Sequence, residues 1–245
     1  MKRLSVLLFL FIFAGLTIAQ EEEEVGWVAR FGIAGGINPV YLFPNLDAVN
    51  VKAKNMGLEE LSSGMIMWGG GGYAYIMIID NVRLGGIGLS GTTSTSGNVL
   101  GYNRQLDYSF GLGGVTVEYT LPFIKTVAVS VGSIIGVGSQ SIEAYENSGD
   151  YTWENAFPQP AYSSLLGTPG SYSKIKNTFF TFTPTLNVDI PISRFIALRV
   201  GGGYVMNFND SWEMNNGRDI FDVPSSLTEN NFFIQTGIYF GFFAF

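Results

Sequence analysis

Histidine is absent from this chain of 245 residues, and so is cysteine. Without histidine, the triads in which an imidazole activates a serine or cysteine nucleophile are unavailable. Transition-metal sites built on His or Cys ligands are excluded for the same reason. An exported chain without cysteine must also be held together without disulfides. The sequence therefore assigns no catalytic residue, no metal site and no cofactor, and it argues against an enzyme.

Charge is also scarce. Charged residues make up 13% of the chain and apolar residues 47%, whereas a soluble domain averages about 25% charged. Beyond the N-terminal segment, no apolar run reaches the ~18 residues that a membrane helix needs. Since only helices and closed barrels satisfy their backbone groups in a bilayer, two classes remain: a large soluble core or a lipid-facing β-barrel. The 32 glycines and 15% aromatic residues favour the barrel.

The N-terminal segment has the pattern of an export signal. Met1-Lys2-Arg3 is a basic start, residues 4–18 are mostly apolar, and Thr17-Ile18-Ala19 is a small-x-small cleavage site. The pattern predicts a signal peptide over 1–19 and one mature domain over 20–245. The mature chain then has 11 basic and 20 acidic residues, a charge of −9, which argues against nucleic acid as a partner.

Eight segments of the chain alternate between apolar and polar residues over lengths that could cross a bilayer as strands, about 9–11 residues each. In the clearest one, Phe180 and Leu186 share one parity, while Thr181 and Asn187 share the other. The pattern predicts an all-β chain that forms an antiparallel transmembrane barrel. The expected strands are Trp27–Ile37, Met65–Ile79, Arg83–Thr92, Gln105–Tyr119, Thr126–Ser139, Thr178–Ile190, Phe195–Phe208 and Asn230–Phe245.

The connections between these segments alternate in length. Antiparallel pairing puts the three short ones (80–82, 121–125 and 191–194) at the end that carries both termini. The long ones, 38–64, 94–104, 140–177 and 209–229, fall at the other end. A ten-stranded barrel is the alternative if part of 140–177 pairs as a hairpin.

The first long connection is expected to contain one short helix near 46–56. Asn45 is a suitable N-cap and Gly57 a suitable stop. Leu46, Val49 and Ala53 fall roughly on one helical face. This helix would lie either on the outer side of the protein or folded into the barrel mouth.

Together, the signal peptide, the eight segments, the pattern of connections and the terminal Phe245 resemble the small eight-stranded outer-membrane barrels of the OmpA, OmpX and OmpW type. No motif selects one subfamily. The resemblance implies the outer membrane of a diderm bacterium, with short periplasmic turns and long outer loops.

The resemblance also implies that the barrel-assembly machinery reads the terminal aromatics, here Phe245 and Phe243. Strict alternation complicates this role, because it turns Phe245 inward when Ile238 and Phe240 face lipid. A bulge near Phe242–Ala244, or aromatics on both faces of the rim, would resolve the conflict.

Charged residues fall on the inward parity of several segments, notably Arg30, Arg199 and Asp189. Inside a narrow barrel they would be costly unless paired. We therefore expect at least one arginine to meet a carboxylate such as Asp107, Glu118 or Asp189. Since side chains usually fill the lumen of an eight-stranded barrel, an open aqueous pore is not expected.

For function, the sequence favours a non-enzymatic barrel with a structural or surface-interaction role through its outer loops. Tyr151, Trp153 and Trp212 are the aromatics expected to contact an extracellular ligand, whose identity stays open. One alternative is a narrow, porin-like conduit for small and possibly apolar molecules, which the OmpW-like resemblance implies. Another is a secreted soluble β-sandwich binding protein, which would bury Phe180 and Phe182 in its core.

Overall fold

The computed structural model describes residues 31–76, 78–124, 127–148, 170–209 and 211–244. The predicted signal peptide lies outside these residues. The elements are β1 (Phe31–Ile37), β2 (Val40–Phe43), α2 (Asp47–Asn55), β3 (Met65–Tyr75), β4 (Val82–Val99), β5 (Tyr102–Thr120), β6 (Ala128–Asn147), β7 (Gly170–Ser193), β8 (Ile196–Phe208), β9 (Trp212–Met214), β10 (Arg218–Ile220), the 3-10 turn η2 (Ser225–Thr228) and β11 (Asn231–Ala244).

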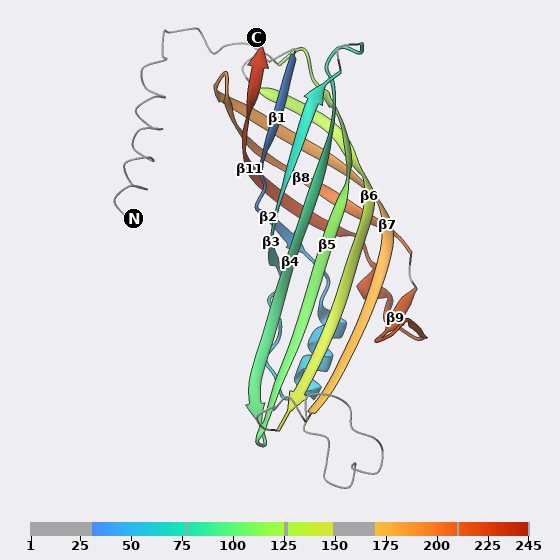
Figure 1. The fold of residues 1–245 in the computed structure, drawn as a ribbon. Helices are drawn as coiled ribbons and strands as arrows, with labels where there is room; N and C mark the ends of the chain where they lie inside the picture. Colours follow the sequence, from blue (N-terminus) through green and yellow to red (C-terminus); the bar gives the residue numbers. More distant parts are fainter. Residues whose placement is uncertain (1–30, 77, 125–126, 149–169, 210, 245) are drawn as a thin grey trace, which may run out of the picture.

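The antiparallel sheet closes on itself as a barrel. β1 and β2 form one wall strand, interrupted at Asn38 and Pro39, and this strand pairs with β3 on one side and β11 on the other. β3 to β8 then pair in chain order, and β8 pairs with β11. The ring therefore has eight strands, as the sequence predicts. Figure 1 shows the C-terminal end at the same end of the barrel as the connections β3–β4, β5–β6 and β7–β8.

Four strands run far beyond the wall. β4, β5, β6 and β7 have 18, 19, 20 and 24 residues, whereas β3 and β8 have 11 and 13. Figure 1 shows them continuing as a curved sheet past the end of β3. We call this part the outer extension; it consists of residues 90–99, 102–111, 139–147 and 170–178. Its edge at β7 is prolonged by the β9–β10 hairpin.

The outer extension corrects two expected loops. The segment 94–104 is a continuous hairpin that turns at Leu100 and Gly101, whose φ angles of 55° and 84° suit the two-residue turn favoured between twisted strands. Residues 140–147 and 170–177 are paired strand as well. The paired residues of the 140–177 segment therefore lengthen β6 and β7 and add no ninth or tenth strand to the ring.

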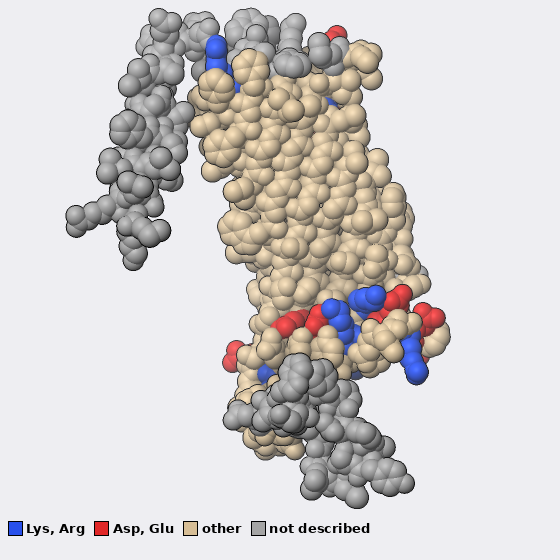
Figure 2. Space-filling view, viewed as in Figure 1, with Lys and Arg blue, Asp and Glu red and all other residues tan. Residues whose placement is uncertain are grey.

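Outward side chains of the barrel wall are apolar and exposed, as period-2 alternation requires. We call these residues the apolar belt: Ile33, Ile37, Trp68, Leu84, Val115, Val117, Val131, Ile135, Val137, Phe180, Phe182, Leu186, Ile190, Leu198, Val200, Tyr204, Phe208, Ile234, Ile238, Phe240 and Phe242. Figure 2 shows a broad uncharged zone on the visible face and a band of charged residues beside it. A closed ring with this surface is not a β-sandwich, so that alternative is wrong.

The helix α2 lies against the concave side of the outer extension. Val49 and Ala53 are buried in one cluster with Leu106, Tyr108 and other inward residues of the wall. The ends of α2 lie close to those expected from the sequence. Asn45 Oδ1 accepts a hydrogen bond from Asp47 N at the start, and Gly57, just after the end, has a φ of 76°. Of the two expected positions, the helix takes the one folded into the mouth. Among the described residues, no helix has the length and apolar character needed to cross a membrane.

The last strand keeps a single register. β11 pairs with β1 without a shift from Ile238 to Ala244. Phe242 is 45% exposed on the outer face, while Phe243 is 5% exposed and faces the lumen. The expected bulge near Phe242–Ala244 is therefore not observed in this pairing, and aromatics occupy both faces near the rim. Phe245 lies outside the described residues.

Candidate functional site

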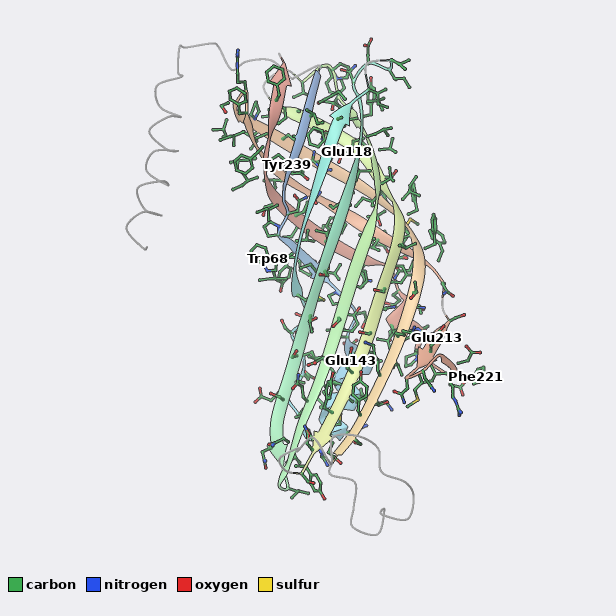
Figure 3. All side chains as sticks on the ribbon, in the orientation of Figure 1. Trp68, Glu118, Glu143, Glu213, Phe221 and Tyr239 are labelled. Atoms are coloured by element: carbon green, nitrogen blue, oxygen red, sulfur yellow. The ribbon has the colours of Figure 1, made fainter. Side chains whose placement is uncertain are left out.

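Four charged side chains from four different strands meet inside the barrel. Arg83 comes from the start of β4, Glu118 from β5, Asp189 from β7 and Arg199 from β8. All four are nearly inaccessible, between 1% and 5% exposed. Figure 3 shows Glu118 in the half of the barrel that carries the short connections. We call these four residues the lumen cluster.

The lumen cluster is internally neutral and extensively bonded. Arg199 donates to both oxygens of Asp189, at 2.6 Å from Nε and 2.9 Å from Nη2, and also reaches Glu118 at 3.3 Å. Arg83 bridges the same two carboxylates, donating to Glu118 through Nε and to Asp189 through Nη1. Such mutual pairing is what makes buried charges tolerable in a lumen without bulk water.

Aromatic rings and amides complete the surroundings. The guanidinium of Arg83 lies 4.3 Å from the ring centre of Tyr73, and that of Arg199 lies 4.6 Å from the ring centre of Tyr239, distances typical of cation–π contacts. Asn187 Nδ2 donates to Glu118 at 2.7 Å. Both carboxylates thus accept several hydrogen bonds from their neighbours. The lumen cluster therefore has a structural role in closing this part of the lumen, and it contains no free base or nucleophile.

Period-2 parity explains how the sequence brings these residues together. Arg199, Asp189 and Glu118 were expected in the lumen, and the structure places all three there. Arg83 was missed, because it follows a short turn and was assigned only to the strand start. Its parity is opposite to that of the outward Leu84, and this was the signal that could have placed it inside.

The other expected lumen charges are not part of the cluster. Asp107 lies on the outward parity of β5, in the outer extension, where both its oxygens accept from Gln105 Nε2 at 2.9 and 3.0 Å. The reason is parity: Leu106 and Tyr108 on either side of it are the buried, inward residues. Arg30 lies outside the described residues.

One of the three aromatic residues expected to contact an extracellular ligand is not on the surface. Trp212 is 1% exposed and packs in the interior cluster, because β9 pairs with β7 and sets Trp212 opposite the buried Asn177. It is therefore not available on the surface as an outer contact residue. Tyr151 and Trp153 lie outside the described residues.

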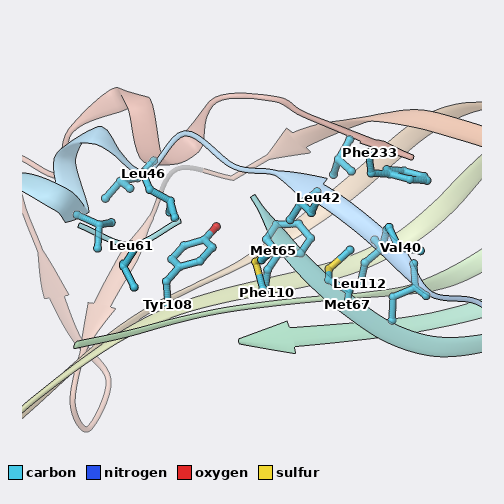
Figure 4. Close-up of a cluster of buried hydrophobic side chains, with 14 of the residues drawn as sticks. Val40, Leu42, Leu46, Leu61, Met65, Met67, Tyr108, Phe110, Leu112 and Phe233 are labelled. Atoms are coloured by element: carbon cyan, nitrogen blue, oxygen red, sulfur yellow. The ribbon is translucent and has the colours of Figure 1, made fainter. Parts of the chain in front are cut away.

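Between the lumen cluster and the outer mouth, apolar side chains fill the barrel. Figure 4 shows this layer, which includes Phe110, Phe233, Leu42, Met67 and Leu112. Next to the lumen cluster, a small cavity of about 10 Å³ is bordered by Glu118, Arg199 and Tyr239 among others, which is room for about one water molecule. The described side chains leave no wide aqueous path through this part of the lumen. Across the described residues, no group of three or more acidic side chains is arranged to hold a metal ion.

A closed eight-stranded barrel with an apolar outer belt and a filled lumen is the architecture of small outer-membrane barrels. No family model and no curated protein matches this chain. Among solved structures it is similar to Ail of Yersinia pestis in complex with sucrose octasulfate, with 9% identity over 88% of this chain and 99% of that one and a TM-score of 0.42. It is also similar to a major outer membrane protein of Thermus thermophilus, with 9% identity over 86% and 99% and a TM-score of 0.44. A third is OprG of Pseudomonas aeruginosa, with 11% identity over 89% and 98% and a TM-score of 0.41. These values describe a distant likeness in shape.

Proposed function

We propose that this protein is a non-enzymatic outer-membrane barrel, exported by its signal peptide, whose outer extension is an interaction surface outside the cell. The observation that carries the proposal is a contrast between the two ends of the same strands. Within the wall the lumen is packed, whereas beyond the wall β4 to β7 expose a broad sheet. In this proposal the terminal aromatics Phe243 and Phe245 guide assembly of the barrel.

The apolar belt supports the membrane location. Its outward side chains would be costly in water and are matched to lipid. Aromatic pairs mark its two ends, with the rings of Phe180 and Phe208 6.5 Å apart on the outer side and those of Phe195 and Phe242 6.3 Å apart on the other. Such aromatic girdles are typical of both membrane interfaces.

The conduit alternative has less support. A solute would have to pass the apolar layer and then the neutral, fully bonded lumen cluster. Opening that cluster means separating buried ion pairs, which costs several kcal/mol per unpaired charge. A closed lumen leaves the exposed strands as the part of the protein that can meet other molecules.

Single cysteines test the topology cleanly, because the chain has none of its own. Ser94→Cys, on the exposed face of the outer extension, should react on intact cells with a membrane-impermeant maleimide. Asp80→Cys, in a short connection, should react only after the cells are lysed. Equal labelling at both positions on intact cells, or recovery of the folded protein in the soluble fraction, would contradict the proposal.

A further inference from the structure

The convex face of the outer extension is polar in rows that cross four strands. On antiparallel strands, register partners on the same face form such cross-strand rows. The pairings of β4 with β5, β5 with β6 and β6 with β7 define five rows. From the apolar belt outward they are Ser90–Gly111–Ser139–Thr178, Thr92–Ser109–Ser141–Lys176, Ser94–Asp107–Glu143–Lys174, Ser96–Gln105–Tyr145–Tyr172 and Asn98–Asn103–Asn147–Gly170.

Two hollows lie on this face, one above the other. The lower hollow has a volume of about 320 Å³ and is lined by hydroxyl side chains of the first two rows, including Ser109 and Ser141, together with Lys174 and Lys176. The upper hollow, of about 490 Å³, is lined by the outer rows, including Asn103, Gln105, Asp107, Tyr145 and Asn147. Both volumes fall within the range of about 300–1,000 Å³ usual for ligand sites.

The upper hollow has the chemistry of a saccharide site. Amide and carboxylate groups are planar and can bond two neighbouring hydroxyls of a sugar ring, while aromatic faces cover its C–H side. Asn98 and Asn103 form only one side-chain hydrogen bond with each other, at 3.0 Å. Asn147 Oδ1 is buried without a hydrogen-bond partner. The rings of Tyr145 and Tyr172 lie side by side, 4.9 Å apart, at the margin.

Charge on this face favours an uncharged ligand group. Lys174 is paired with Glu143 at 2.7 Å, and Lys176 with Glu213 at 3.2 Å. Figure 2 shows charged residues of both signs gathered in a band at the border of the uncharged zone. Each lysine already faces a carboxylate, and Arg104, which lines the upper hollow, is paired with Glu146 at 2.6 Å. No excess of positive charge is therefore left to select a sulfated or phosphorylated group.

The location of the hollows favours a ligand that comes from the bilayer. The row Ser90–Gly111–Ser139–Thr178 directly follows the outermost belt residues, with Phe180 next to Thr178 and Val137 next to Ser139 on the same face. Along one face the chemistry thus changes from apolar, through hydroxyl, to amide and aromatic. The same order runs along a glycolipid, from acyl chain through head group to outer sugars.

We propose that the convex face of the outer extension binds the saccharide head group of a glycolipid in the surrounding leaflet. The inference rests on the proposed outer-membrane location. The lower hollow receives the sugar nearest the acyl chains, and the upper hollow hydrogen-bonds the next sugars. A glycolipid would then be held beside β4 to β7, with its acyl chains against the apolar belt.

The test is native mass spectrometry of the purified, folded protein in detergent, titrated with an uncharged diglycosyl diacylglycerol as the acylated saccharide. Phosphatidylglycerol serves as the lipid without sugar, and the deacylated saccharide as the sugar without lipid. The variant Asn103→Ala/Gln105→Ala removes two exposed amides from the upper hollow. The matched control Ser62→Ala/Ser63→Ala changes two exposed residues outside both hollows. Heat-modifiable gel mobility confirms that each variant is folded.

Wild type should bind the uncharged glycolipid, and the amide variant should bind it about tenfold more weakly, as expected for the loss of one or two net hydrogen bonds. The control and the affinity for phosphatidylglycerol should be unchanged. Equal binding of the uncharged glycolipid by wild type and the amide variant would overturn the proposal. So would equally tight binding of the deacylated saccharide, which would make the ligand a free glycan. Either result leaves the membrane location standing, because that location is tested separately by cysteine labelling.

Discussion

Asp189 and Arg199 face each other as register partners across the β7–β8 pair, and Arg199 Nε donates to Asp189 Oδ1 at 2.6 Å. Their contact joins the two strands of the hairpin whose short connection is residues 194–195. Arg83 and Glu118 complete the same cluster from β4 and β5. This neutral group of four side chains therefore links β4 and β5 to β7 and β8 across the lumen.

Replacing Asp189 should destabilise the barrel strongly. Asp189→Asn leaves two buried guanidinium groups facing one carboxylate, and loss of one partner from a buried pair costs about 3–5 kcal/mol. We expect a matching fall in the free energy of unfolding, measured by urea titration of the protein in lipid vesicles. The double variant Asp189→Leu/Arg199→Leu should recover much of that loss, since Arg83 and Glu118 then pair alone.

The control for this experiment is Glu213→Gln. Its pair with Lys176 has the same charges, but its side chains are 44% and 46% exposed. Exposed pairs contribute about 0–1 kcal/mol. A loss at Asp189 no greater than the loss at Glu213 would show that the lumen cluster does not stabilise the barrel.

Breaking the lumen cluster should not open a pore. Arg199→Ala removes a charged side chain, but the apolar layer of Phe110, Phe179 and Phe233 still fills the lumen on the outer side. We expect neither wild type nor this variant to show steady conductance in planar bilayers. Steady current from wild type would contradict the filled lumen, and current only from the variant would show that the cluster is the sole barrier.

Parity made the wall of this barrel predictable. A strand exposed to lipid on one face and packed on the other must alternate, so Phe180 outward and Thr181 inward follow from sequence alone. The same rule placed Arg199 and Asp189 inside, and Glu118 was named as one of the carboxylates that an arginine could meet there. Arg83 was assigned to the start of a strand but not to a face of it. The sequence therefore predicted the lumen cluster without this residue.

The outer extension was not predictable in the same way. Outside the bilayer, the outward face of a strand need not be apolar. The stretch from Ser94 to Asn98 was therefore interpreted as part of a polar loop, although it is paired throughout. Burial of Trp212 depends on β9 pairing with a distant strand edge, which no local pattern encodes. Asp107 was expected as a possible partner of an inward arginine, but its neighbours Leu106 and Tyr108 are the buried residues, so Asp107 faces outward.

A charge in the middle of the apolar belt should block assembly. Leu186 is 54% exposed on the outer face, and arginine on the lipid face near the midplane costs about 2–4 kcal/mol. Leu186→Arg should lower the folded fraction on heat-modifiable gels after refolding into lipid vesicles. Ser141→Arg, on the same parity but in the outer extension, is the matched control and should refold like wild type. Equal refolding of both variants would contradict the assignment of the belt to lipid.

The hydroxyl of Tyr145 donates to Glu143 Oε2 at 2.6 Å on the convex face, and this contact has consequences for titration. Hydrogen bonds from Lys174 and Tyr145 hold the pKa of the Glu143 carboxyl below its ordinary value. The same bond to Glu143 raises the pKa of Tyr145 above its ordinary value of about 10. Because the pKa of Glu143 is lowered by folding, its contribution to stability is present above about pH 4.3 and is lost as the pH falls through the lower, folded value.

Glu143→Gln should therefore move the pKa of Tyr145 back toward 10, because the carboxylate that stabilises the protonated phenol is gone. Tyr172 also donates to Glu143, at 3.0 Å, so its pKa should fall in the same variant. Ultraviolet titration of phenolate formation between about pH 9 and 12 measures both, with Tyr145→Phe and Tyr172→Phe identifying each contribution. An unchanged curve in Glu143→Gln would show that the carboxylate does not hold these two hydroxyls in solution, and the margin of the upper hollow would then be less ordered than its geometry indicates.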